Sequence, residues 1–199
     1  ASPWGNGRAG EKARLIADGM AVKPTKLYRR DHSTRAGRAG GGQMTIANKL
    51  KAYLESKSID YDLIPHPHTE SSMETAAAAH VPGDRLAKAV IVKDGDAYLM
   101  VVVPSDYHVH LGALHRRLGR EVGLATEPEL TSLFPDCDEG AAPALGAAYG
   151  LRSMVDEVLL EAPEVFFEAG DHEHLVRVSA DQFAVLQADA EKVDIGRHI

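Results

Sequence analysis

The chain has 199 residues, of which 44% are apolar and 26% charged, and its formal net charge at pH 7 is −7. This composition is typical of a single globular domain with a hydrophobic core, and the one cysteine excludes an internal disulfide. No apolar run approaches the roughly 18 residues that span a bilayer, and the N-terminus lacks the apolar core of a secretory signal. We therefore predict a cytoplasmic protein that does not associate with membranes.

Charge is distributed unevenly along the chain. Residues 1–43 hold 9 Lys/Arg and 3 Asp/Glu, whereas residues 44–199 hold 13 and 26. The first stretch is rich in glycine and lacks a sustained apolar pattern, so we predict that it is disordered. It is either a basic arm that adds affinity for RNA or, as we favour, a non-native leader before a natural start at Met44. Residues 44–199 are too acidic to wrap a nucleic acid nonspecifically, which argues against DNA and confines any RNA contact to a small basic mouth.

The first part of residues 44–199 predicts two helices around a short strand. Apolar residues at helical spacing indicate a helix that starts near Thr45, and residues 60–64 alternate like a strand. Ser71 and Glu74 have the spacing of a capping box, which predicts a short helix that ends near Pro82. The apolar positions of the first helix are Ile46, Leu50, Tyr53 and Leu54.

A β-hairpin is the next predicted element. Residues 88–93 and 97–103 are rich in β-branched residues and are separated by Asp94-Gly95-Asp96, a strong turn signal. An amphipathic pattern then predicts a helix over residues 109–118, which is closed near Gly119. A short strand is expected at residues 121–125.

The remaining elements alternate between helix and strand. A helix begins at Thr126-Glu127-Pro128 and ends at Phe134-Pro135, short extended segments follow near Met154 and at residues 165–168, and a strand at 174–178 precedes a helix at 180–187. Because helices and strands interleave without strict βαβ alternation, we predict an α/β fold of the α+β type. Its central sheet is mixed and largely antiparallel, with helices around it.

Three separate segments carry residues suited to binding and chemistry. Lys88 lies in the strand-like run 87–92, the loop 140–146 is built from small residues and one proline, and a turn at 170–174 contains two histidines. A lysine on a strand is held rigidly, and a loop of Gly and Ala lets a ligand approach bare N–H groups. Together the segments offer a cation, backbone amides and an imidazole that titrates near neutrality.

The order and spacing of these segments resemble the YbaK/prolyl-tRNA editing-domain family from roughly Ile46 to Gln187. Members hydrolyse the ester of wrongly charged aminoacyl-tRNA. The resemblance implies that the 3′ end of aminoacyl-tRNA is the substrate, that an aminoacyl-tRNA synthetase is a candidate partner, and that no cofactor, metal or protein nucleophile is needed. It also implies that the ribose hydroxyl of the substrate orients the attacking water.

The resemblance assigns roles to individual residues. Lys88 holds the terminal phosphate or ribose side of the substrate, the amides of Gly140 and Ala141 stabilise the carbonyl oxygen, and His172 positions water or substrate or acts as a base. Leu145 stands where relatives often have an aromatic residue, which leaves the amino-acid preference open. The implied substrate-binding residues are His68, Thr69, Ala142, Pro143, Leu145, Gly146, Gly170 and His174.

Two further expectations concern histidines near these segments. If residues 172–174 are extended, His172 and His174 point to the same face, and His172 is the one that matches the Gly-x-His element of relatives. In the polar turn after residue 65, His68 and Thr69 are expected at the pocket and His66 at its rim.

Other interpretations of the same residues stay open. Three His-x-His pairs, at 66/68, 108/110 and 172/174, would allow a zinc hydrolase, although their spacing is not a recognised zinc signature. Cys137 lies three residues before the glycine loop and would allow covalent catalysis, but a free cysteine is more often a packing residue. A noncatalytic module that binds aminoacyl ends or a synthetase is the third alternative.

Overall fold

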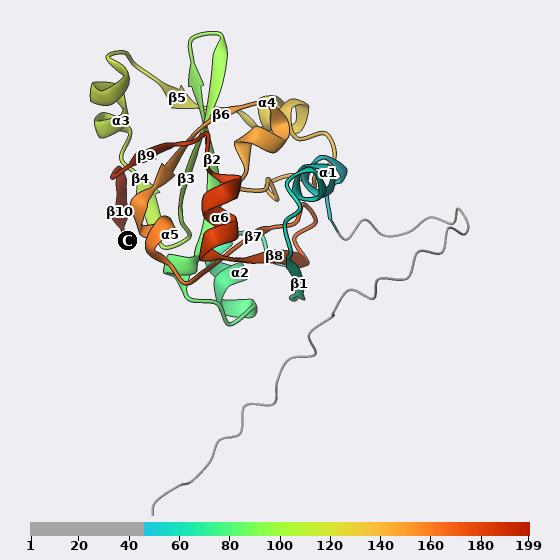
Figure 1. The fold of residues 1–199 in the computed structure, drawn as a ribbon. Coiled ribbons are helices and arrows are strands. Elements are labelled where there is room, and N and C mark those ends of the chain that lie inside the picture. Colours follow the sequence, from blue (N-terminus) through green and yellow to red (C-terminus); the bar gives the residue numbers. More distant parts are fainter. Residues whose placement is uncertain (1–45) are drawn as a thin grey trace, which may run out of the picture.

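The computed structural model describes residues 46–199, and the predictions for residues 1–43 and for Met44 lie outside this range. Within the described residues, eight strands form one sheet in the order β1-β8-β7-β2-β3-β6-β9, with β5 paired to β2 (Figure 1). None of the helices in this part of the chain is both long and apolar enough to cross a membrane. The strands of the sheet are β1 (Asp62–Pro65), β2 (Leu86–Asp94), β3 (Ala97–Pro104), β5 (Gly123–Leu124), β6 (Arg152–Asp156), β7 (Glu164–Glu168), β8 (His174–Ser179) and β9 (Glu191–Val193).

Most strand pairs are antiparallel, as predicted. The pairs β1–β8, β7–β8, β2–β3 and β2–β5 are antiparallel, whereas β2–β7, β3–β6 and β6–β9 are parallel. The predicted hairpin of β2 and β3 turns at Gly95, whose φ of +65° favours glycine. The predicted fold class, a mixed and largely antiparallel sheet with helices around it, is confirmed.

Helices cover both faces of the sheet (Figure 1). Leu54 of α1, Phe167 of β7 and Phe183 of α6 share one hydrophobic cluster, while Leu114 of α3 packs with Val101 of β3 in another. Because successive strand side chains alternate between faces, β3 contributes to both clusters and is apolar almost throughout. The helices are α1 (Asn48–Ser56), α2 (Ser72–Ala78), α3 (Leu111–Leu118), α4 (Glu127–Leu133), α5 (Glu157–Glu161) and α6 (Ala180–Leu186), with 3₁₀ turns η1 (Gly83–Arg85) and η2 (Gly146–Tyr149).

Local signals explain where several helices begin and end. The Ser71 side chain accepts a hydrogen bond from the Glu74 N–H, and Thr126 with Glu129 forms a capping box at the start of α4. Gly119, with φ of +68°, ends α3 in the left-handed conformation. Helix α2 ends at Ala78, before the expected Pro82.

The C-terminal strands were not predicted. Strand β4 (Tyr107–Val109) pairs with β10 (Gly196–His198) in a separate two-stranded sheet. This pairing corrects the predicted helix over residues 109–118, because Val109 belongs to β4 and α3 begins only at Leu111.

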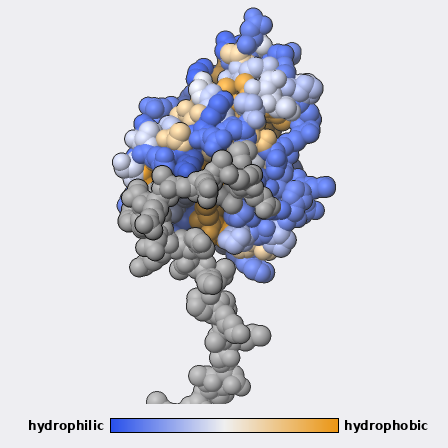
Figure 2. Space-filling view, turned by 90° about the vertical axis from the view of Figure 1, so that its right-hand side faces the viewer, coloured by the Kyte–Doolittle hydropathy of each residue, from blue (hydrophilic) through white to orange (hydrophobic). Residues whose placement is uncertain are grey.

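Figure 2 shows that the face on the α1 side is mostly hydrophilic, as the high content of charged residues implies.

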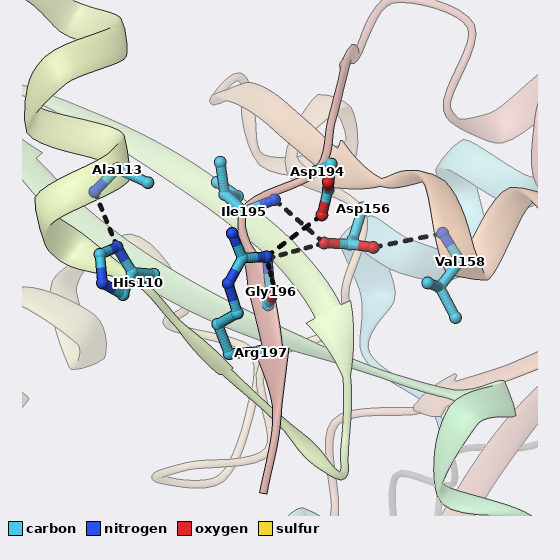
Figure 3. A network of polar contacts seen from close by, with 8 residues as sticks. All are labelled: His110, Ala113, Asp156, Val158, Asp194, Ile195, Gly196 and Arg197. Carbon is cyan, nitrogen blue, oxygen red and sulfur yellow. Dashed lines mark hydrogen bonds and ion pairs between the residues drawn. The ribbon is translucent and has the colours of Figure 1, made fainter.

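The buried carboxylate of Asp156 joins β10 to the main sheet (Figure 3). Asp156 is 2% exposed and ends β6, where its Oδ1 accepts the Val158 N–H at 3.2 Å. Its Oδ2 accepts the N–H groups of Ile195 at 3.4 Å and Gly196 at 2.8 Å. One side chain therefore starts α5 and fixes the approach to β10.

We expect Asp156→Ala to lower the free energy of unfolding by about 2 kcal/mol or more, because it leaves the buried N–H groups of Ile195 and Gly196 unpaired at about 1 kcal/mol or more each, and the partly buried N–H of Val158 also loses its acceptor. Urea denaturation measures this, with Asp194→Ala as the control because Asp194 is exposed and Arg197 is its one ion-pair partner within residues 46–199. A loss below about 1 kcal/mol for Asp156→Ala would show that water replaces the carboxylate.

Candidate active site

Lys88 and Glu168 lie beside each other on neighbouring parallel strands. In the register of β2 and β7, Leu86 pairs with Phe166 and Ala87 with Phe167, so Lys88 and Glu168 are the next positions on the two strands. Residues opposite each other in register share a face of the sheet. Both side chains line a pocket of about 120 Å³.

The ammonium of Lys88 is held at the end of β3. Its Nζ donates to the Ser105 carbonyl oxygen at 3.0 Å, and the buried Ser105 is itself fixed because its N–H donates to the Leu86 oxygen at 2.7 Å. Partial burial lowers the pKa of Lys88, and the nearby Asp106 carboxylate opposes this shift. An ammonium has three donors, and Ser105 is the one hydrogen-bond partner found for it in residues 46–199.

The predicted loop contributes backbone amides to the same pocket. Gly140, with φ of +89°, and Ala142 line the pocket, and neither N–H has a hydrogen-bond partner in the described part of the chain. Ala141 differs from the expectation because it is fully buried and its N–H donates to the Asp138 oxygen at 3.0 Å. The donors that the loop offers are therefore Gly140 and Ala142, in place of Gly140 and Ala141.

The second half of the loop is part of the core. Leu145 is 1% exposed, and the Ala144 carbonyl accepts the Gln187 side-chain amide at 2.8 Å. A Cβ on Gly146 would lie 2.1 Å from Ser153 Oγ, so Gly146 allows close approach of the chain. Pro143, Leu145 and Gly146 are absent from the pocket wall within the described residues, and Leu145 does not shape this pocket.

The imidazole of His172 lies against Gly140. A Cβ on Gly140 would be 3.4 Å from His172 Cε1, and His172 Nε2 lies 2.7 Å from the Glu139 carbonyl oxygen. Because a carbonyl only accepts, Nε2 carries the hydrogen, and in the neutral ring Nδ1 is left as an acceptor. His172 has a φ of +57°, a conformation that His adopts more readily than most residues.

Residues 172–174 are not extended throughout, so the condition for His172 and His174 to share a face is not met. Strand β8 begins only at His174, and the positive φ of His172 turns its backbone out of the strand. His174 Nδ1 donates to Asp171 Oδ2 at 2.7 Å, and His174 does not line the Lys88 pocket. The preceding Gly170 permits close packing, because a Cβ there would be 2.9 Å from that of Ala47.

The polar turn after β1 is arranged differently from the expectation. His66 is 7% exposed and therefore does not lie at a rim. Its backbone N–H donates to the Glu173 carbonyl oxygen. Burial of its ring lowers the pKa of the imidazole. His68 is exposed, with its ring centroid 5.4 Å from that of His172, and borders a neighbouring groove. Thr69 lies 2.7 Å from the Thr75 hydroxyl, which donates to Glu168.

Glu168 is a pocket residue that the sequence did not predict, as are Glu70, Ser71 and Ser72. The Thr75 hydroxyl donates to Oε1 at 3.2 Å, whereas Oε2 is buried and has no partner in residues 46–199. Burial raises the pKa of this carboxyl from 4.5 to about 7, although the nearby His172 lowers it. The available signal was an acidic residue at the end of the apolar strand 165–167, directly before Ala169-Gly170.

Glu168 is expected to make stability depend on pH. The folded protein keeps the proton to about pH 7 and the unfolded chain to about pH 4.5, so the free energy of unfolding falls as pH rises through this window. The loss is at most about 3 kcal/mol. Glu168→Gln removes the titration, so relative to wild type it should gain stability between pH 5 and pH 8 in urea denaturation. A stability difference that does not change with pH would contradict the raised pKa.

Cys137 is not suited to nucleophilic catalysis. Its Sγ lies 3.2 Å from the Tyr149 hydroxyl, and burial raises its pKa to about 11, so the thiol stays protonated at neutral pH. It does not border the Lys88 pocket. In residues 46–199 no group of three or more His, Cys, Asp or Glu side chains is arranged to hold a metal ion.

A larger groove of about 670 Å³ lies at the β1 edge of the sheet. Arg177 lines this groove, and its guanidinium is paired with Asp62 at 3.3 Å and with Glu164 at 2.7 Å. Because these charges satisfy one another, we place the candidate active site at the smaller Lys88 pocket.

A lysine, two unpaired amides and an imidazole around one pocket define a site that can hold an ester carbonyl beside an anionic group. The family model of the aminoacyl-tRNA editing domain matches residues 66–186, more than half of the chain. The protein therefore belongs to the aminoacyl-tRNA editing domain family, and the resemblance found in the sequence is confirmed.

Solved structures share the fold. A crystal structure of "a putative trans-editing enzyme for prolyl tRNA synthetase" has a TM-score of 0.67 and 22% sequence identity, over 79% of this chain and 99% of the other. The hypothetical protein APE2540 has a TM-score of 0.65 and 22% identity, over 75% and 100%. No curated protein sequence matches the chain.

Proposed function

We propose that the protein is a freestanding, cytoplasmic aminoacyl-tRNA deacylase that removes noncognate amino acids from tRNA. The observation that carries the proposal is the meeting of Lys88, the Gly140 and Ala142 amides and His172 at one pocket. Membership of the editing-domain family supports the substrate class, which is the 3′ end of aminoacyl-tRNA. An aminoacyl-tRNA synthetase is the proposed protein partner.

Each group has a role in ester hydrolysis. Lys88 holds the phosphate or ribose side of the substrate as a point charge. The Gly140 and Ala142 amides donate to the ester carbonyl oxygen as negative charge develops on it. Nδ1 of His172 accepts a hydrogen bond from the attacking water or from the substrate.

The reaction needs no protein nucleophile. Water adds to the ester carbonyl carbon, the bond between this carbon and the ribose oxygen breaks, and the proton of the water passes to the ribose oxygen. The products are a free amino acid and uncharged tRNA. A hydroxyl of the substrate ribose orients the water, as the family resemblance implies.

The test is deacylation of a panel of tRNAs charged with alanine, serine, cysteine or proline, with and without EDTA. Hydrolysis that resists the chelator and is lost in Lys88→Ala would support the proposal. Loss of activity in EDTA would instead favour a metallohydrolase. Binding of aminoacyl ends without turnover would favour a noncatalytic module.

A further inference from the structure

Two opposite charges beside the pocket do not neutralise each other. Lys88 and Glu168 occupy adjacent positions on β2 and β7, yet no ion pair joins them in residues 46–199. Neighbouring strands lie about 4.8 Å apart, a separation that long side chains readily bridge. Their separation therefore has a structural cause.

Each side chain is drawn to a different partner. Lys88 leans toward the end of β3, where the carbonyl of the next residue, Ser105, accepts from its ammonium at 3.0 Å. Glu168 leans toward α2, where the Thr75 hydroxyl donates to it at 3.2 Å. Thr75 is almost fully buried, and its one hydroxyl hydrogen is shared between Glu168 Oε1 and the Ser71 carbonyl oxygen, which lies 3.0 Å away and fixes the position of the hydroxyl. Lys88 and Glu168 thus hold opposite charges on one wall of the pocket, which the exposed Glu70 also borders.

The anionic group lacks compensation. Oε2 of Glu168 is buried without a hydrogen-bond partner among the described residues, and the Lys88 ammonium is not close enough to pair with it. An unpaired buried carboxylate is unfavourable, and the raised pKa of Glu168 has this physical cause. A cationic ligand group in the pocket would remove the penalty.

The 3′ end of an aminoacyl-tRNA carries an anionic group, an acceptor and a cationic group, which are complementary to the groups of the pocket. Its phosphodiester is anionic, its carbonyl oxygen is an acceptor in the middle, and its α-ammonium is cationic. The pocket offers Lys88 for the first, the Gly140 and Ala142 amides for the second and Glu168 for the third. His172, which contacts Gly140, already supplies a proton acceptor beside the amides.

We propose that Glu168 binds the α-ammonium group of the aminoacyl ester and so restricts the site to amino acids with a free amine. This inference rests on the proposed function. An N-acylated aminoacyl-tRNA has no cation to offer, and its acyl group leaves the carboxylate buried and unpaired.

The test compares the panel's best aminoacyl-tRNA with its N-acetylated form, in wild type, Glu168→Gln and Glu164→Gln. Glu164 lies on the same strand but borders the larger groove, so it is the matched control. We expect wild type and the control to prefer the free amine by about 10- to 100-fold in kcat/KM, as a hydrogen bond to a charged group allows. In Glu168→Gln the preference should fall to within about threefold.

Other results would overturn the inference and leave the proposed function intact. Equal hydrolysis of both substrates by wild type would show that the protein does not recognise the α-ammonium group. An equal loss on both substrates in Glu168→Gln would show that Glu168 is a general base.

A binding measurement separates this inference from the proposed function. Calorimetry with 3′-deoxy-3′-(L-alanylamino)adenosine and its N-acetyl derivative needs no hydrolysis. Tighter binding of the free amine that disappears in Glu168→Gln supports the inference even if no tRNA is deacylated. Equal affinities, or no binding of either compound, overturn it.

Discussion

Lys88→Ala is expected to lower kcat/KM for deacylation by about 10³-fold or more while the protein stays folded. In the proposed mechanism the ammonium faces the anionic part of the substrate, and a loss of about 4 kcal/mol of transition-state binding corresponds to this factor. Stability should change little, because partial burial already disfavours the charged form of Lys88. Initial rates with the best substrate of the panel, and thermal melts of both proteins, measure the two effects.

Lys93→Ala is the matched control for this experiment. Lys93 lies on the same strand, but its Nζ pairs with Glu129 at 2.6 Å on the surface, outside the pocket. It should keep activity within about twofold of wild type, since surface ion pairs contribute little. Lys88→Met retains most of the apolar stem, so a loss equal to that of Lys88→Ala would assign the effect to charge. Full activity in folded Lys88→Ala would contradict the proposed role of Lys88 in binding the substrate.

Local chemistry made much of the fold predictable. The Asp94-Gly95-Asp96 turn between two β-branched runs predicted a hairpin, and Thr126-Glu127-Pro128 marked a helix start. These features depend on residues a few positions apart, and the sequence states such spacings directly.

The remaining features depend on contacts between distant segments. Glu168 is a pocket residue because β7 pairs in parallel with β2, a register that no local pattern encodes. The pairing of β4 with β10 likewise moved the start of α3. The occupied amide of Ala141 depends on the turn that brings it to the Asp138 oxygen, in which Gly140 has a φ of +89°, and a sequence does not reveal this geometry.

The second large effect is expected at the loop amides. Gly140→Ala should reduce kcat/KM for deacylation by about 100-fold. Gly140 has φ of +89°, and an added Cβ would lie 3.4 Å from Cε1 and 3.5 Å from Nε2 of His172. The added Cβ would make only ordinary contact with the His172 ring, but a side chain is strained at this φ, so the loop rotates and redirects the Gly140 N–H. Removal of a single donor to a developing oxyanion has effects of about 10²- to 10³-fold.

Gly150→Ala separates backbone strain from this local effect. Gly150 has φ of +71°, and an added Cβ there would meet nothing within 4 Å, so the substitution introduces comparable strain away from the pocket. Both variants should melt at similarly lowered temperatures, and only Gly140→Ala should lose most of its activity. If the two variants lose activity to within about threefold of each other, the loss follows from general destabilisation, and the Gly140 amide does not stabilise the transition state.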